Sequence, residues 1–255
     1  MLITFSELIS QSFEKYFQNF KKVLPYLGIA LIAFLLRYAI GYLGVFLAFN
    51  TRLSAILSDL IILLLLIIVA ILGYWSYLAL IKLCQNFYQG MPSSVFKINF
   101  FNSKKYLVPF FLISLVSTLL IALGGLLLFI PGLIFFVWYY FSNYIVIFED
   151  KNSLGVLSDS KNLAVGRWFA VVFRIAVPKL VFSLLSGLLG KVILSLFILI
   201  FSPSAIAYDL AFEFIAGIVT ILMLPLFIWQ DIILYYNLKQ TPIVLNQNNP
   251  TTAQQ

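Results

Sequence analysis

The sequence predicts an all-α, polytopic membrane protein with six transmembrane helices. Apolar residues make up 63% of the 255 residues and charged residues only 10%, whereas soluble domains average about 25% charged residues. The mean hydropathy is +1.06. Several stretches without charge reach the length of about 20 residues that a helix needs to cross roughly 30 Å of hydrocarbon. A soluble domain and a disordered chain both lack this composition and are excluded.

The first 22 residues predict an amphipathic helix that lies in the membrane interface. Apolar side chains recur at spacings of three and four from Leu2 to Phe20, and charged or amide side chains take the opposite side. Glu7 and Glu14 stand where a signal peptide would carry a basic start, and no short apolar core leads to a cleavage motif. A signal peptide is therefore excluded.

Six spanning helices are expected after this segment. The stretch 106–148 has 43 uncharged residues, which would make about 64 Å of helix, roughly twice a bilayer. It must fold back, and Ile130-Pro131-Gly132 supplies the break because proline cannot continue a helix interior. The expected spans are 23–49, 60–81, 106–129, 132–149, 168–189 and 208–236.

The stretch 168–201 is also too long for one straight span. Gly190-Lys191 is taken as the exit of the fifth span, so that residues 192–203 form an interfacial or re-entrant piece. The last span is expected to bend at Pro225. Residues 241–255 carry no charge, are rich in Asn, Gln, Thr and Pro, and predict a disordered tail after the single membrane domain 1–240.

The net charge of +7 indicates orientation. Both termini share one side with two of the loops, and this side collects Lys15, Lys21, Lys22, Lys82, Lys97, Lys104, Lys105, Lys151, Lys161, Arg167 and Lys239. The other side has Arg52 and Lys191. By the positive-inside rule both termini are cytoplasmic, and the location is the bacterial cytoplasmic membrane. The cations are expected to contact anionic lipid headgroups, and no foldable soluble domain carries a nucleic-acid patch.

A short unit recurs along the chain. Residues 17–24 and 100–107 both end an amphipathic stretch with a lysine pair before a span, and 152–167 gives a third version leading into Trp168. The second version is expected to start a helix at Pro92-Ser93-Ser94. Internal repetition is one explanation. The other is that any polytopic protein places Lys and aromatic residues at span entrances.

Catalytic and metal-binding chemistry finds little support in the composition. The chain has no His and one Cys, Cys84, so the commonest general base, the commonest metal ligand, a disulfide and a Cys-based metal site are all missing. No nucleophile triad, metal set or cofactor loop is present. We expect a non-enzymatic protein without cofactor.

Three charges are expected deep in the last two spans. At 1.5 Å per residue, Arg174 lies about 9 Å inside the cytoplasmic end of span five, and Asp231 about 7.5 Å inside that end of span six. Their matched depths predict an Arg174–Asp231 ion pair. Lys179 is deeper and either pairs with Asp231 or faces a polar cavity.

Two further charges lie toward the outer side. Arg37 is expected about 15 Å below the exit of span one and Glu213 about 7.5 Å below the mouth of span six, and a snorkelling arginine can cover part of that difference. Asp59 and Asp209 are rival partners nearer the surface. All five intramembrane charges have two interpretations: ion pairs that fix helix packing, or the lining of a substrate or ion path.

The stretch EDKNSLGVLSDSKNLAVGRWF at 149–169, preceded by the Pro131-Gly132 break, resembles a bacterial membrane family that includes the membrane domain of glycerophosphodiester phosphodiesterases. The residues that carry the resemblance are Pro131, Gly132, Glu149, Leu157, Ser160, Leu163, Gly166, Arg167 and Trp168. This chain has Val156 where the family often has Ala, and Asp159 where it often has Arg or Lys. The resemblance implies a six-span membrane domain of poorly understood role. Some relatives fuse it to a phosphodiesterase catalytic domain, and we do not expect that activity here.

The sequence therefore favours a non-enzymatic integral membrane protein with an accessory or scaffold role, in contact with lipids and with a protein partner or a second copy. The alternative is a transporter or permease subunit whose charges line a polar path. A third class, an enzyme acting on lipid through Glu149, Asp150, Asp159 and Asp231, is the least favoured because nine acidic residues and no His offer little acid–base chemistry.

Overall fold

The computed structural model describes residues 2–50, 55–91, 95–202 and 204–242, and these are helical with no strand among them. Nearly all of the described chain is contained in α-helices and one 3₁₀ helix, η1. The elements are α1 (Phe5–Asn50), α2 (Ala55–Tyr88), α3 (Phe96–Asn102), η1 (Ser103–Tyr106), α4 (Leu107–Leu127), α5 (Phe129–Tyr139), α6 (Ser142–Phe148), α7 (Gly155–Ala164), α8 (Trp168–Phe201) and α9 (Ala205–Gln240). The predicted all-α class is confirmed.

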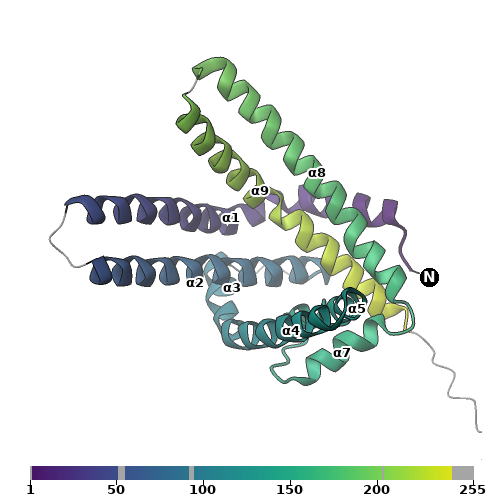
Figure 1. Cartoon of the computed structure of the whole chain (residues 1–255). Coiled ribbons are helices and arrows are strands. Elements are labelled where there is room, and N and C mark those ends of the chain that lie inside the picture. Colours follow the sequence, from purple (N-terminus) through teal and green to yellow (C-terminus); the bar gives the residue numbers. More distant parts are fainter. Residues whose placement is uncertain (1, 51–54, 92–94, 203, 243–255) are drawn as a thin grey trace, which may run out of the picture.

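Three helical hairpins, α1–α2, α4–α5 and α8–α9, share a common region that we call the hub. The hub contains the start of α1, the end of α2, α6, α7, the start of α8 and the end of α9, with α3 and η1 against its side. Figure 1 shows the α1–α2 and α8–α9 hairpins projecting in different directions from the hub toward their connecting turns, which we call the tips. The recurring units 17–24, 100–107 and 152–167 lie at or just before the start of the first, second and third hairpin, respectively.

Burial separates the hub from the tips. One core cluster joins Leu8 and Tyr26 of α1 to Ile81 of α2, Phe141 near α6 and Trp229 of α9. Toward the tips, large apolar side chains stay exposed, including the whole run around the α4–α5 turn and the first half of α2. Exposed contiguous apolar surface on this scale is typical of helices that face lipid.

Six helical segments of the described chain are long and apolar enough to cross a membrane. They are Phe5–Leu47, Ile56–Tyr88, Phe96–Leu127, Phe129–Phe148, Trp168–Phe201 and Ala207–Gln240. The six-helix prediction is therefore confirmed at the level of length and composition, and it makes the protein a multi-pass membrane protein.

The expected fold-back between the third and fourth spans is present at Leu128, three residues before the proline. Leu128 is extended (φ −165°, ψ 154°) and α5 begins at Phe129, so Pro131 occupies the first turn, where its missing N–H costs nothing. Gly132 then lies against α4: a Cβ there would be 2.8 Å from the Cα of Gly125. The glycine lets the two helix backbones touch, which fixes the hairpin.

Two expected boundaries are wrong. The N-terminal amphipathic segment is not a separate helix, because α1 runs without interruption from Phe5 through Pro25 to Asn50. Its buried stripe, which includes Leu8, Ser12 and Tyr16, packs into the core. A proline in a long helix is tolerated where neighbouring groups satisfy the freed backbone.

The second wrong boundary is the exit at Gly190-Lys191. Helix α8 continues through both residues to Phe201, so 192–201 is not a separate piece. One glycine costs a helix only about 1 kcal/mol, which the long apolar helix offsets. Arg52, the expected helix start at Pro92-Ser93-Ser94, Pro203 and the tail beyond Pro242 lie outside the described residues.

Candidate functional site

Lys179 and Asp231, two of the predicted intramembrane charges, form one cluster between α8, α9 and the α5–α6 segment. The Lys179 ammonium lies 3.1 Å from the Asp231 carboxylate. The hydroxyls of Tyr140 and Tyr144 each donate to that carboxylate at 2.6 Å. Asp231 is 2% exposed, and the Lys179 ammonium also lies 5.0 Å from the centre of the Tyr140 ring. Three donors on one carboxylate offset the cost of its burial.

The expected Arg174–Asp231 pair is not formed. Arg174 instead donates to the main-chain oxygens of Ile3 and Ala170, and its guanidinium lies over the ring of Phe5. Depth along the helix axis alone misplaced the partners, because side chains lean toward the N-terminus of their own helix. Helix α8 starts in the hub and α9 ends there, so Lys179 leans toward the hub and Asp231 away from it. The Lys179 and Asp231 side chains therefore lean toward each other. The Arg174 side chain leans toward the hub and so away from Asp231.

Gln230, beside Asp231, repairs a break in α8 that sequence analysis missed. Pro178 has no N–H, so the carbonyl of Arg174, four residues earlier, loses its helical partner. The fully buried Gln230 side chain donates to the carbonyls of Arg174 and Ile175 at 3.2 and 3.0 Å. A polar residue following Trp229 on an apolar helix, together with the internal Pro178 of the preceding helix, is a sequence signal that could have indicated this contact.

Arg37 and Glu213, the two predicted charges toward the outer side, lie close together but do not form an ion pair with each other. Arg37 and Glu213 line one hollow of about 270 Å³ between the tip halves of α1 and α9, but neither forms an ion pair with another described residue. Glu213 accepts a hydrogen bond from the Tyr38 hydroxyl at 3.2 Å. The rivals Asp59 and Asp209 make no ion pair within the described chain either.

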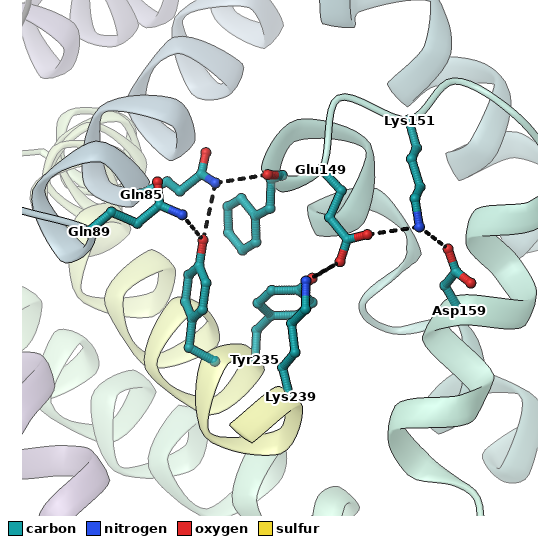
Figure 2. Close-up of polar contacts among 9 residues, drawn as sticks. Gln85, Gln89, Glu149, Lys151, Asp159, Tyr235 and Lys239 are labelled. Atoms are coloured by element: carbon teal, nitrogen blue, oxygen red, sulfur yellow. Dashed lines mark hydrogen bonds and ion pairs between the residues drawn. The ribbon is translucent and has the colours of Figure 1, made fainter. Parts of the chain in front are cut away.

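A second polar cluster closes the hub (Figure 2). Figure 2 shows Glu149, at the end of α6, facing Tyr235 and Lys239 of α9 on one side and Lys151 on the other. The Glu149 carboxylate lies 2.8 Å from Lys151 and 2.7 Å from Lys239, and accepts from the Tyr235 hydroxyl at 2.6 Å. Lys151 also contacts Asp159 of α7 at 2.6 Å. The cluster therefore ties α6, α7 and α9 together.

This environment makes Glu149 a strong acid. Partial burial alone would raise its pKa, but the hydrogen bonds from Lys151, Lys239 and Tyr235 outweigh that cost and lower the pKa to about 2. For Asp150, which is more exposed, partial burial also opposes ionisation, but hydrogen bonds from Lys105, 2.7 Å away, and from Tyr106 outweigh it and lower the pKa. Both groups are held as carboxylates, and neither has the raised pKa of a general acid.

Ser160, one of the residues shared with the resembling family, fills the gap between α5 and α6. Its hydroxyl donates to the carbonyl of Trp138 at 2.6 Å and accepts from the N–H of Phe141 at 3.1 Å. The side chain is fully buried. It thus supplies hydrogen bonds at the point where the helix is interrupted, and Leu157 and Leu163 pack on either side of it against the core.

The Gly166-Arg167-Trp168 turn joins α7 to α8 and caps α9. Gly166 has φ +80°, a conformation that glycine adopts without strain. Arg167 donates to the carbonyls of Leu163, Leu238 and Thr241, so it closes the C-terminal end of α9. Trp168 stacks on the following Phe169. Glu149, Ser160, Arg167 and the other family-like residues from 149 to 168 therefore lie in the hub, whereas Pro131 and Gly132 lie at the α4–α5 turn.

Comparisons with known proteins found no match, so the function has to be argued from the geometry of the structure. No family model matches the chain, and no match is found among curated proteins or solved structures. Within the described residues, no three His, Cys, Asp or Glu side chains gather closely enough to hold a metal ion. Glu149, Asp150 and Asp159 each contact a lysine, and Asp231 lies in the separate cluster beside Lys179.

A further buried polar contact was not anticipated. Asn99 of α3, 4% exposed, donates to the hydroxyl of Tyr26 and the carbonyl of Ala79 at 2.8 and 3.0 Å. It fastens the short helix before the second hairpin to both helices of the first. Only tertiary packing distinguishes Asn99 from the exposed polar residues around it, so no sequence pattern would have found it.

Proposed function

We propose that this chain is a non-enzymatic integral protein of the cytoplasmic membrane with an accessory or scaffold role. The observation that carries the proposal is the Lys179–Asp231 cluster. Lys179 and Asp231 form an ion pair, and Tyr140 and Tyr144 donate hydrogen bonds to Asp231. Such contacts are expected of charges that fix helix packing rather than move a solute.

The hub supports a cytoplasmic, lipid-contacting face. Lys21, Lys97 and Lys104 are exposed and form no ion pair with another described residue. Phe17 and Phe101, close to them in sequence, are 69% and 56% exposed. Exposed cations beside exposed aromatic rings suit the boundary between acyl chains and anionic headgroups. In this proposal both termini are cytoplasmic, and the amphipathic start of α1 contributes its outward side to that boundary.

The transporter alternative finds less support. Arg37 and Glu213 line a hollow between α1 and α9, whereas Lys179 and Asp231 meet between α8, α9 and the α5–α6 segment. The hollow is not lined by either member of the deep pair, so the five charges do not line one path.

Reconstitution into proteoliposomes tests the proposal against both rivals. We expect no flux across a broad panel of ions and small solutes and no hydrolysis of lipid phosphodiesters. Flux that Asp231→Asn abolishes would establish the transporter, and robust lipid turnover by the purified chain would establish an enzyme.

The lipid-contacting role of the hub has its own test. In nanodiscs that mix anionic and zwitterionic lipids, the protein should enrich anionic lipid, and the triple variant K21Q/K97Q/K104Q should lose that enrichment. The control is Lys191→Gln, whose cation lies near the α8–α9 tip. Equal enrichment in the triple variant and in wild type would contradict the role.

Orientation is tested with two single-cysteine reporters. Cys84 is fully buried, so the native chain gives little background with a membrane-impermeant maleimide. Asn152→Cys in the hub should be protected in intact spheroplasts, and Asp209→Cys near the α8–α9 tip should react. The opposite pattern would overturn the orientation.

A further inference from the structure

The tip halves of α1 and α9 separate above a tight contact and leave a hollow between them. At the contact, the ring of Phe34 lies against Gly217 so closely that a Cβ there would be 2.1 Å from the ring. Phe214 then packs on Phe34 and Tyr38, with ring centres 5.6 Å apart in both pairs. Figure 1 shows the two hairpins diverging toward their tips.

The hollow combines a cation, an anion and apolar walls. Arg37, Tyr38 and Tyr42 line it from α1, and Leu210 and Glu213 line it from α9. Its volume is about 270 Å³. Arg37 and Glu213 face the same space without closing into an ion pair, while Tyr38 donates to Glu213 and orients it. The arrangement matches a ligand that carries both signs of charge.

Because the hollow lies between two membrane-spanning helices, we expect its ligand to be a lipid headgroup. Arg37 lies within Phe5–Leu47, a segment long and apolar enough to cross a membrane, at the expected depth of about 15 Å below the exit of the first span. Both Arg37 and Glu213 are exposed, so they face lipid rather than protein. Exposed charges at such depth are costly unless a counter-charge accompanies them. A phospholipid headgroup drawn inward to the depth of Glu213, toward which the long Arg37 side chain can extend, supplies both counter-charges.

We propose that this hollow binds a phospholipid of the tip-side leaflet whose headgroup joins a phosphate to a primary ammonium, as in phosphoethanolamine. Arg37 binds the phosphate, and Glu213, oriented by Tyr38, accepts hydrogen bonds from the ammonium. An anionic headgroup without an amine would be repelled by Glu213. A quaternary ammonium has no N–H to donate to it. This proposal requires that the chain spans a membrane. It does not depend on which side of the membrane the termini lie, or on whether the chain is an enzyme.

The test measures lipid retention by the full chain. The full chain carrying K21Q/K97Q/K104Q, which removes the anionic-lipid contacts proposed for the hub, is exchanged into micelles with equal amounts of phosphatidylethanolamine, phosphatidylglycerol and phosphatidylcholine of identical acyl chains, and bound lipid is counted by native mass spectrometry. We expect phosphatidylethanolamine to be preferred about tenfold over each of the others. Arg37→Gln should lower its retention about tenfold. Glu213→Gln should remove the preference over phosphatidylglycerol.

Three controls make the result decisive. Lys191→Gln removes a tip-side cation outside the hollow and should leave the preference unchanged. Arg37→Lys keeps the charge and should retain binding, which separates loss of the site from loss of folding. Soluble phosphoethanolamine should not compete, because it lacks the acyl chains. Equal retention of the three lipids, or unchanged retention in both Arg37→Gln and Glu213→Gln, would overturn the proposal. Competition by the soluble compound would overturn the lipid assignment.

Discussion

Removing either member of the Lys179–Asp231 pair should destabilise the folded protein, and the two losses should be coupled. Lys179→Met leaves the Asp231 carboxylate, 2% exposed, with only its two tyrosine donors. Breaking a buried pair typically costs about 3–5 kcal/mol. Because the Lys179 side chain is 32% exposed, the lower end applies, so we expect about 3 kcal/mol for Lys179→Met. Asp231→Asn should cost a similar amount, since it strands the cation and weakens two charged hydrogen bonds.

The assay is a double-mutant cycle on the free energy of unfolding in mixed micelles. The double variant should be less destabilised than the two single losses added together, with a coupling of at least about 1.5 kcal/mol. A neutral interhelical hydrogen bond in a membrane averages only about 0.6 kcal/mol, so coupling of this size identifies the ion pair. Additive losses, or single variants as stable as wild type, would refute the assignment of this pair to helix packing.

Three further predictions concern the hub and the hairpin contacts. Ser160→Ala should lower the free energy of unfolding by about 1–3 kcal/mol, because it strands a buried carbonyl and a buried N–H, whereas Ser158→Ala, exposed on the same helix, should change it little. Glu149 has a folded pKa of about 2 against an ordinary 4.5, so its stabilising contribution is complete above pH 4.5 and disappears as the pH falls toward 2; an unfolding titration should show this loss, and Glu149→Gln should flatten it. Gly132→Ala should destabilise the protein by about 1–3 kcal/mol through the clash with the facing helix, whereas Gly28→Ala, with no atom within 4 Å of its Cβ, should be neutral or slightly stabilising in a thermal unfolding assay.

The sequence was sufficient for the helical class, the number of long apolar helices and the fold-back before Pro131. These features depend on hydropathy over about 20 residues and on a Pro-Gly pair, which is better suited to the first turn of a helix than to its interior. The continuity of α1 and α8 was missed for a related reason. Pro25 and Gly190 are weak breakers inside long apolar helices, and neighbouring contacts decide whether a helix bends or ends there.

The partners within the candidate sites were less predictable. Depth placed Asp231 opposite Arg174, but the lean of side chains toward each helix N-terminus joined it to Lys179 instead. Contacts such as Gln230 on the freed carbonyls of α8, or Ser160 in the gap after Tyr139, connect segments far apart in sequence. Such contacts depend on how the hairpins cross, and periodicity along one helix carries no information about that.

A structure of the protein in a lipid nanodisc, at a resolution that shows ordered water, tests the central claim most directly. The account predicts that the Lys179 ammonium and the Asp231 carboxylate touch, with the hydroxyls of Tyr140 and Tyr144 on the same carboxylate and no water-filled channel leading to it. A continuous file of water that reaches Asp231 from either side, with the pair separated, would contradict the account and favour a transport path.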